Sequence, residues 1–169
     1  MKKILLLCIS HLILSLSFSQ TNPEACNCCS EAQKAFDFWI GEWMVYDTTG
    51  NKIGENNILS MQNHCVLQEN WKSANSTGTS YNYYNQQDKS WNQLWVDNQG
   101  NPLVLKGNFK EGKMVMRDEL SKQRNGQMAY NQISWEKQED GSVIQLWLVL
   151  DEDGKQLAQL FKGIYKKAG

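Results

Sequence analysis

Turn signals recur at a nearly constant interval in the second half of the chain. Five glycines lie 12 to 15 residues apart, each beside an Asn, Asp, Glu, Gln or Lys: Gly100, Gly112, Gly126, Gly141 and Gly154. Strand-like sequence fills each interval, and short strands joined by tight turns are typical of an all-β barrel or sandwich. The spacing therefore predicts an up-and-down antiparallel β-barrel, a fold that can enclose a small-molecule cavity.

Alternating polarity divides the chain into a short helix and about ten strands. The helix is expected over about 31–39, because Ser30 can cap it and apolar residues recur at helical spacing up to Trp39. Strand 142–151 is apolar on both faces, so this helix is a candidate cover for its outer face. The first strand is expected after the helix, and the others at about 52–61, 63–73, 78–86, 90–97, 101–109, 113–121, 126–137, 142–151 and 156–166.

The first 19 residues have the pattern of a secretory signal peptide. Two lysines precede a mostly apolar run, and Ser17 and Ser19 place small residues where a signal peptidase reads. The run is too short to span a membrane. We expect cleavage before Gln20 and export to the periplasm or the outside of a bacterial cell. The mature chain is then a Cys-containing tether at 20–29 and one β-barrel domain at 30–169.

The composition of the mature chain argues against nucleic acid as a partner. All 18 acidic residues and 15 of the 17 Lys and Arg residues follow residue 19, and their signs alternate without a basic block. No second long apolar stretch occurs, so no membrane span is expected. The full sequence has seven Trp, six Tyr and five Phe with two Pro, and all of these except Phe18 follow residue 19. Many aromatic residues with few prolines suit a continuous sheet around an interior. Nothing in the residue pattern indicates an oligomeric state.

Four cysteines follow the predicted signal peptide: Cys26, Cys28, Cys29 and Cys65. In an exported protein they are expected to form disulfides. A bond between the neighbours Cys28 and Cys29 would strain the backbone. We therefore expect Cys65 to pair with one cysteine of the Cys26, Cys28 and Cys29 cluster and to fasten the N-terminal segment to the barrel. Free thiols and a structural metal site are the alternatives, although Cys-x-Cys-Cys is not a usual zinc spacing, so no metal is expected.

Indole and amide side chains share faces of neighbouring expected strands. Alternate residues of a strand point to the same side, which groups Glu69 with Trp71 and groups Trp91, Gln93 and Trp95. Indole rings supply flat apolar walls and a glutamine both donates and accepts, so this lining suits a small, partly apolar ligand. The alternative is a filled core in a structural or interaction protein. The expected ligand contacts are Glu69, Trp71, Asn82, Trp91, Gln93 and Trp95, with Gln132, Gln145 and Trp147 as further candidates.

Glu69 is the one candidate for catalytic chemistry. If it faces inward beside Trp71, its carboxyl group needs polar partners. It could bond a ligand, or act as general acid or base in an isomerase- or hydrolase-type enzyme. The structural alternative is a pair with Arg117, Lys106 or a Trp N–H group. No second catalytic group stands at a motif spacing, so binding is the expected function and no catalytic residue is assigned.

Five sequence blocks between Cys26 and Tyr165 carry a family resemblance. They are FDFWIGEW at 36–43, ENW at 69–71, GTSYNYY at 78–84, WNQLWVDNQG at 91–100 and FKGIY at 161–165. Together they resemble a family of bacterial exported lipocalin-like domains of unknown function. The resemblance implies a calycin-like β-barrel, distantly similar to fatty-acid-binding and nitrobindin-like barrels, and it implies no activity.

The resemblance does not carry haem binding over to this chain. Nitrobindin-like barrels hold haem through a histidine late in the chain, whereas the one histidine after residue 19 is His64. We expect His64 to be a surface or turn histidine rather than a haem or metal ligand, and we expect no cofactor.

Overall fold

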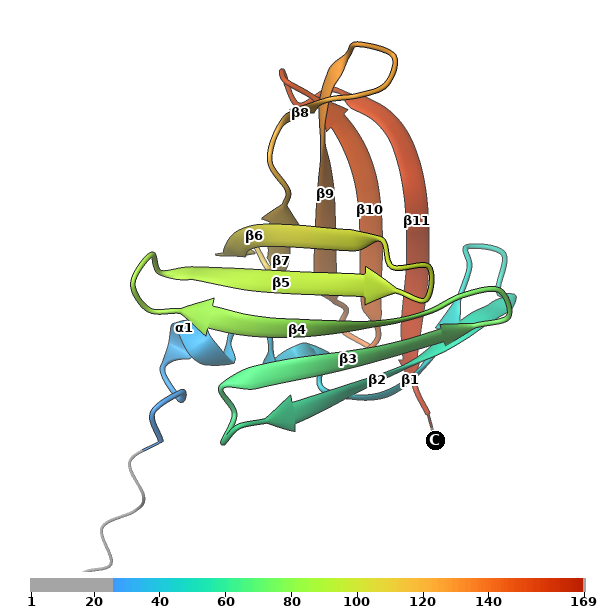
Figure 1. Cartoon of the computed structure of the whole chain (residues 1–169). Coiled ribbons are helices and arrows are strands. Elements are labelled where there is room, and N and C mark those ends of the chain that lie inside the picture. The colour runs from blue at the N-terminus through green and yellow to red at the C-terminus, as the bar shows by residue number, and fades with distance from the viewer. Residues whose placement is uncertain (1–25, 169) are drawn as a thin grey trace, which may run out of the picture.

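The computed structural model describes residues 26–168, which form a closed antiparallel β-barrel preceded by a short helical segment (Figure 1). The predicted signal peptide at 1–19, its cleavage site and residues 20–25 of the predicted tether lie outside the described residues. The strands are β1 (Gly41–Tyr46), β2 (Lys52–Met61), β3 (Val66–Ser73), β4 (Thr77–Asn85), β5 (Ser90–Asp97), β6 (Pro102–Lys110), β7 (Lys113–Arg117), β8 (Ser121–Lys122), β9 (Met128–Lys137), β10 (Val143–Asp151) and β11 (Gln156–Lys167).

Ten of these strands close the barrel, which confirms the predicted fold class. Each strand from β1 to β6 pairs antiparallel with the strand that follows it in the chain. Strand β7 pairs with β9, β9 pairs with β10, and β10 pairs with β11. Pairing of β11 with β1 closes the ring. Strand β8 is a two-residue addition that pairs with β9. Closure leaves no long open edge in the ring of ten strands.

The glycine rhythm marks the hairpin turns. The five glycines that set the spacing have φ angles between 79° and 85°. This left-handed conformation carries a steric penalty for other residues and none for glycine. The spacing of the glycines therefore predicted the positions of these turns, because each turn has a residue with positive φ.

Two strands are shorter than expected. The strand expected at 63–73 begins at Val66, because Gln62, Asn63 and His64 all have positive φ and form the β2–β3 turn. The strand expected at 113–121 ends at Arg117. There the Asp118 carboxylate accepts hydrogen bonds from the backbone N–H and the side chain of one residue, Asn131, each at 2.6 Å.

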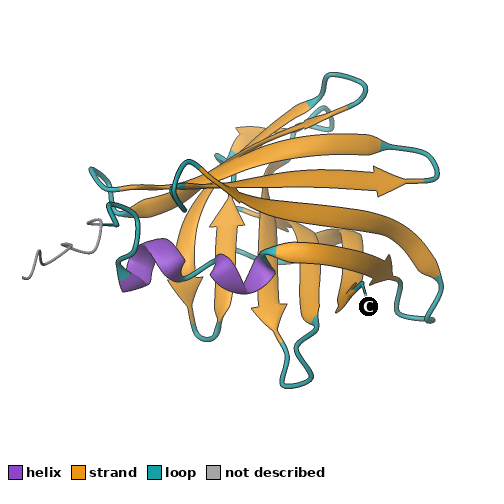
Figure 2. Cartoon of the chain, turned by 90° about the horizontal axis from the view of Figure 1, so that it is seen from below, coloured by secondary structure: helices purple, strands orange, loops and turns teal. Residues whose placement is uncertain are grey.

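The helical segment lies across one end of the barrel (Figure 2). It consists of α1 (Glu31–Lys34), which Ser30 caps as expected, and the 3-10 turn η1 (Asp37–Trp39). The rings of Phe36 and Trp39 are fully buried and contact Trp135 from the barrel interior. The expectation that this helix covers the outer face of β10 is therefore wrong. Its aromatic side chains fill the barrel end instead, where they are removed from water on all sides.

The half of the interior nearest the helix is a packed apolar core. Indole N–H groups anchor the helical segment to it: Trp91 donates to Ala32 O at 2.9 Å and Trp43 donates to Trp39 O at 2.8 Å. The core is completed by Val45, Ile58, Leu67, Leu105, Met114, Met116 and Val143, and Ile133 lies between this core and the open half.

Two cysteine pairs lie at disulfide distance. Cys28 lies beside Cys65, with Cα atoms 5.1 Å apart, and Cys26 lies beside Cys29 at 5.4 Å. The first pair joins the segment before α1 to the β2–β3 turn, as expected for a fastening of the N-terminal segment. Within residues 26–168 no group of three potential metal ligands is found. The helices in the same range are too short and too polar to cross a membrane.

Candidate functional site

The barrel interior is hollow at the end away from the helical segment. A cavity of about 490 Å³ lies there and extends to the β3–β4 turn, where Asn75 and Ser76 line it. This volume falls within the range of about 300–1,000 Å³ that is typical of small-molecule sites. The barrel thus has one packed half and one open half.

Aromatic rings form the walls of the cavity. Trp71 from β3, Trp95 from β5, Trp147 from β10 and Phe161 from β11 all line it. The ring of Phe161 meets that of Trp71 edge to face, with centroids 5.9 Å apart. The indole N–H of Trp147 donates to Asn131 Oδ1 at 2.8 Å, which holds this ring in place. The walls are completed by Ile53, Leu103, Ile133 and Leu160.

Three of these rings lie against a glycine that is next to them in the sheet. A Cβ atom at Gly78 would overlap the indole of Trp95, and one at Gly54 would overlap Trp71. Gly163 leaves room for Phe161 in the same way. The absence of a side chain at these glycines therefore makes room for the rings next to the sheet.

A buried carboxyl group forms the floor of the cavity. Glu69 from β3 is 5% exposed and accepts two hydrogen bonds, from Asn56 Nδ2 and from Ser80 Oγ, each at 2.7 Å. Burial raises the pKa of this carboxyl group to about 7, because the charged form loses its hydration, and the two donors offset part of the rise. Glu69 therefore changes its protonation near neutral pH.

Tyr165 and Gln145 lie beside Glu69 in the floor. Burial, together with the nearby charge of Glu69, raises the pKa of Tyr165 well above its ordinary value, so its hydroxyl group stays protonated. That hydroxyl donates to Gln145 Oε1 and accepts a hydrogen bond from Asn56 Nδ2. The three side chains form one polar layer between the aromatic walls and the apolar core.

The polar floor retains unused hydrogen-bonding capacity. Gln93 Nε2 donates to Asn82 Oδ1 at 2.8 Å, while Gln93 Oε1 accepts no hydrogen bond from the residues that the structure describes. Gln145 Nε2 is likewise without an acceptor in residues 26–168. The Glu69 carboxylate accepts two bonds of about four that its oxygens can take. A ligand in the cavity would find free acceptors and one free donor.

Four of the six expected ligand contacts line this cavity: Glu69, Trp71, Gln93 and Trp95. Asn82 is fully buried behind the floor, where it bonds Gln93, Ser80 Oγ and Leu67 O. Trp91 packs against Phe36 in the core at the helix end. Asn82 thus supports the floor, and Trp91 seals the packed half.

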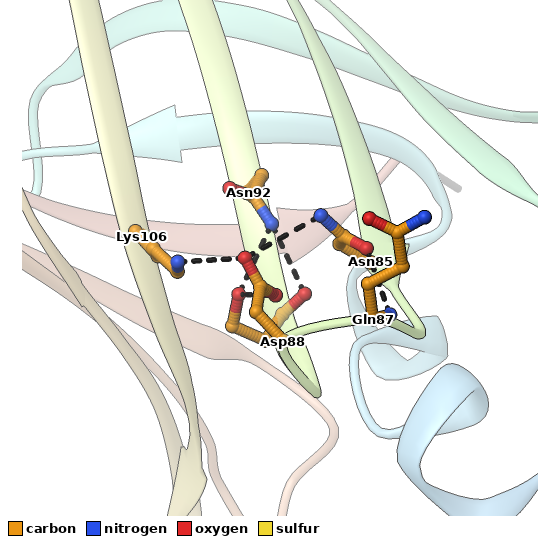
Figure 3. Close-up of polar contacts among 6 residues, drawn as sticks. Asn85, Gln87, Asp88, Asn92 and Lys106 are labelled. Carbon is orange, nitrogen blue, oxygen red and sulfur yellow. Dashed lines mark hydrogen bonds and ion pairs between the residues drawn. The ribbon is translucent and has the colours of Figure 1, made fainter.

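The cationic partners considered for Glu69 lie elsewhere. Lys106 Nζ pairs with Asp88 Oδ2 at 2.7 Å on the outside of the β4–β5 hairpin (Figure 3). Ser90 Oγ also donates to Asp88, and the hydrogen bond from Lys106 is the largest of the effects that lower the pKa of this exposed carboxyl group. Arg117 stacks over the Tyr130 ring. The structural alternative of a pair with Arg117 or Lys106 is therefore wrong, because β6 and β7 point these cations to the outside. Within residues 26–168 no Trp N–H group donates to Glu69 either.

Among the further candidates, Gln145 and Trp147 line the cavity and Gln132 does not. In β9 the neighbouring residue Ile133 is buried inside the barrel, so alternation turns Gln132 outward. Sequence reasoning missed Asn56, Phe161 and Tyr165. Alternation within the expected strands 52–61 and 156–166 could have shown that these residues face inward. Asn56 shares a face with Ile58, and Phe161 shares a face with Tyr165.

His64 lies in the exposed β2–β3 turn, as expected. Its Nδ1 atom is 3.0 Å from Ser60 Oγ, and it does not line the cavity. The position of His64 is thus that of a turn residue. The absence of a haem or other cofactor stays a prediction.

No protein-family model matches the chain, and a search of curated proteins found no match. The resemblance of the five sequence blocks to exported lipocalin-like domains therefore stays a prediction. The feature of the molecule that points to a function is the cavity.

Proposed function

We propose that this protein is an exported binding protein that holds a small, partly apolar molecule inside its barrel. The observation that carries the proposal is the composition of the cavity, with four aromatic rings as walls and a hydrogen-bonding floor around Glu69. Apolar walls bury the body of a ligand, and a few fixed polar groups orient it. The binding would take place in the open half of the barrel.

The unused polar groups of the floor support binding over a purely structural role. Gln93 and Gln145 line the cavity and present Gln93 Oε1 and Gln145 Nε2, which bond no other described residue. A solid scaffold gains nothing from placing these two amides beside an unfilled space. A ligand in the cavity can form hydrogen bonds with both groups.

Two further observations support export. Cys28 and Cys65 lie at disulfide distance, and disulfides persist in oxidising compartments. The N-terminal 19 residues have the composition of a signal peptide. The five-block resemblance to exported lipocalin-like domains agrees with both.

Binding of a neutral reporter tests the proposal. N-phenyl-1-naphthylamine is apolar, uncharged at neutral pH and fluorescent when removed from water. We expect a saturable one-site rise in its fluorescence, weakened at least about tenfold by Trp95→Ala through loss of aromatic contact area. Tyr83→Ala is the matched control, because Tyr83 is an exposed aromatic residue on the outer face of β4. No saturable signal, or equal effects of both variants, would overturn the proposal.

The titration of Glu69 near neutral pH favours one second candidate, an isomerase- or hydrolase-type enzyme. A general acid or base works best when its pKa lies near the working pH, and Glu69 meets this condition in a cavity. Incubation with a small-molecule extract, followed by mass spectrometry, separates the candidates. An enzyme converts a compound and loses that conversion in Glu69→Gln, whereas a binding protein converts nothing.

A further inference from the structure

The charged groups at the cavity are all acidic. Glu69 lies at its floor and Asp97 at its mouth. Asp97 is exposed and accepts hydrogen bonds from Asn101 and Gln99, and the bond from the Asn101 side chain is the largest cause of its lowered pKa, so it is ionised. Within residues 26–168 no Lys, Arg or His lines the cavity. A ligand carboxylate or phosphate would meet repulsion here and no opposite charge.

Glu69 has neutral partners on every element packed against it. Asn56 on β2 and Ser80 on β4 donate to it, and Tyr165 on β11 is the nearby titratable group, which stays protonated. Its carboxylate form is therefore buried without a counter-ion. A buried charge without a partner is strongly unfavourable, and a cation that forms hydrogen bonds with it offsets part of that cost. The Glu69 carboxylate therefore has hydrogen-bond donors at the cavity floor and no cation from the described residues beside it.

The walls favour a cation for an independent reason. The faces of Trp71, Trp95 and Trp147 carry the negative side of the ring quadrupole, and tryptophan gives the strongest attraction of the aromatic side chains for an ammonium group. The attraction is larger in a site that excludes water. Walls and floor therefore select the same charge.

We infer that the natural ligand is an organic amine, bound as its ammonium ion, with an apolar or aromatic body. The inference rests on the proposed binding function and names its ligand class. The ammonium group donates to Glu69 and to Gln93 Oε1, two acceptors at the cavity floor. The body of the bound ligand lies between the aromatic walls and extends toward the mouth of the cavity beside Asp97. This lining disfavours fatty acids and other carboxylates.

Three probes with the same ring test the charge preference. They are 2-(1-naphthyl)ethylamine, 2-(1-naphthyl)ethanol and 1-naphthylacetate, each titrated into the mature protein near pH 7.5 by calorimetry. We expect the amine to bind at least about tenfold more tightly than the alcohol, because charge-assisted hydrogen bonds and cation–π contacts act on the amine. The carboxylate is expected to bind more weakly than the alcohol.

The Glu69→Gln variant assigns the preference to the floor. It keeps the size of the side chain and removes the charge, so we expect it to bind amine and alcohol with similar affinity. Glu55→Gln is the matched control, since Glu55 is exposed on the outer side of β2 and pairs with Lys52. Circular dichroism of both variants checks that the barrel is folded.

Each pattern of results is informative. If none of the three probes binds, and the neutral reporter does not bind either, the proposed function and this inference both fail. If the alcohol or the carboxylate binds as tightly as the amine, the cation inference fails while the binding function stands. If Glu69→Gln does not fold, the wild-type protein still decides the question. Its affinity for the amine, but not for the alcohol, must then fall on acidification below the pKa of Glu69.

Discussion

At the scale of single residues, Glu69 is the residue whose position has the largest physical consequence. The barrel removes its carboxyl group from water and supplies two neutral donors in exchange. Two hydrogen bonds replace only part of the hydration of a carboxylate, so the protonated form is favoured up to about pH 7. The floor therefore carries a negative charge at the expense of stability, as expected for a binding site rather than a core.

This arrangement predicts that Glu69 destabilises the fold as the pH rises. The unfolded chain releases the proton near the ordinary pKa of 4.5, whereas the folded chain holds it up to about 7. Folding stability thus falls over this interval, and the loss from one group amounts to about 3 kcal/mol. In Glu69→Gln this loss is absent. Urea unfolding near pH 5 and near pH 8 should show the variant gaining about 2–3 kcal/mol on the wild type. Parallel changes in the two proteins would contradict the account.

The glycines beneath the aromatic rings carry a second prediction. Gly78→Ala places a methyl group where the Trp95 indole lies, so the ring must tilt into the cavity. We expect a loss of about 1–3 kcal/mol in unfolding free energy, together with weaker binding of N-phenyl-1-naphthylamine. Thr79→Ala, one residue away on the outer face of β4, serves as the control. Unchanged reporter affinity in Gly78→Ala would show that ring position does not set the cavity.

At the scale of elements, the connection between the helical segment and the barrel decides which end is closed. Aromatic side chains of η1 and the preceding residue occupy the interior, and the Cys28–Cys65 pair holds the segment from the other side. Both contacts act on the same barrel end. The opposite end holds the cavity, whose lining comes from the strands and the β3–β4 turn and includes no residue of the helical segment.

The length of the loop that each cysteine pair closes predicts unequal effects on stability. Cys28 and Cys65 are 37 residues apart, whereas Cys26 and Cys29 are three apart. A longer loop restricts the unfolded chain more, so replacing both Cys28 and Cys65 by Ser should cost about 3 kcal/mol. The double Ser variant of Cys26 and Cys29 is the control and should cost clearly less. Equal losses in urea unfolding would contradict this assignment.

The strands could be predicted from sequence because alternation and turn glycines are local signals. The β2–β3 turn was predicted too short, because Gln62, Asn63 and His64 have no glycine among them, although all three adopt positive φ. The face of β9 was ambiguous because both of its faces mix polar and apolar residues. The helix was misplaced because sequence periodicity shows which side of a helix is apolar and not what that side packs against.

Part of the candidate site could be predicted from the sequence, because alternation is a local signal there as well. Glu69, Trp71, Gln93 and Trp95 lie on two strands whose alternation is clear, and all four line the cavity. The partners of Glu69 depend on the register of β2, β4 and β11 around the closed barrel. No local pattern specifies that Asn56 and Tyr165, 109 residues apart, meet at one carboxyl group.

At the scale of the whole molecule, the barrel is divided along its axis into a packed half and a hollow half. The seven tryptophans follow this division. Trp39, Trp43, Trp91 and Trp135 are buried in the core, and the remaining three, Trp71, Trp95 and Trp147, line the cavity. Each indole N–H gives its own signal in a ¹H–¹⁵N correlation spectrum, so the protein carries reporters for both halves.

The most direct test of the central claim is therefore a titration of ¹⁵N-labelled mature protein with 2-(1-naphthyl)ethylamine, followed through the indole signals. The account predicts saturable shifts of the Trp71, Trp95 and Trp147 signals, while the four core signals stay in place. Trp→Phe variants assign the signals. If the lining signals move with neither this amine nor N-phenyl-1-naphthylamine, or if all seven signals move together, the hollow half of the barrel is not a binding site.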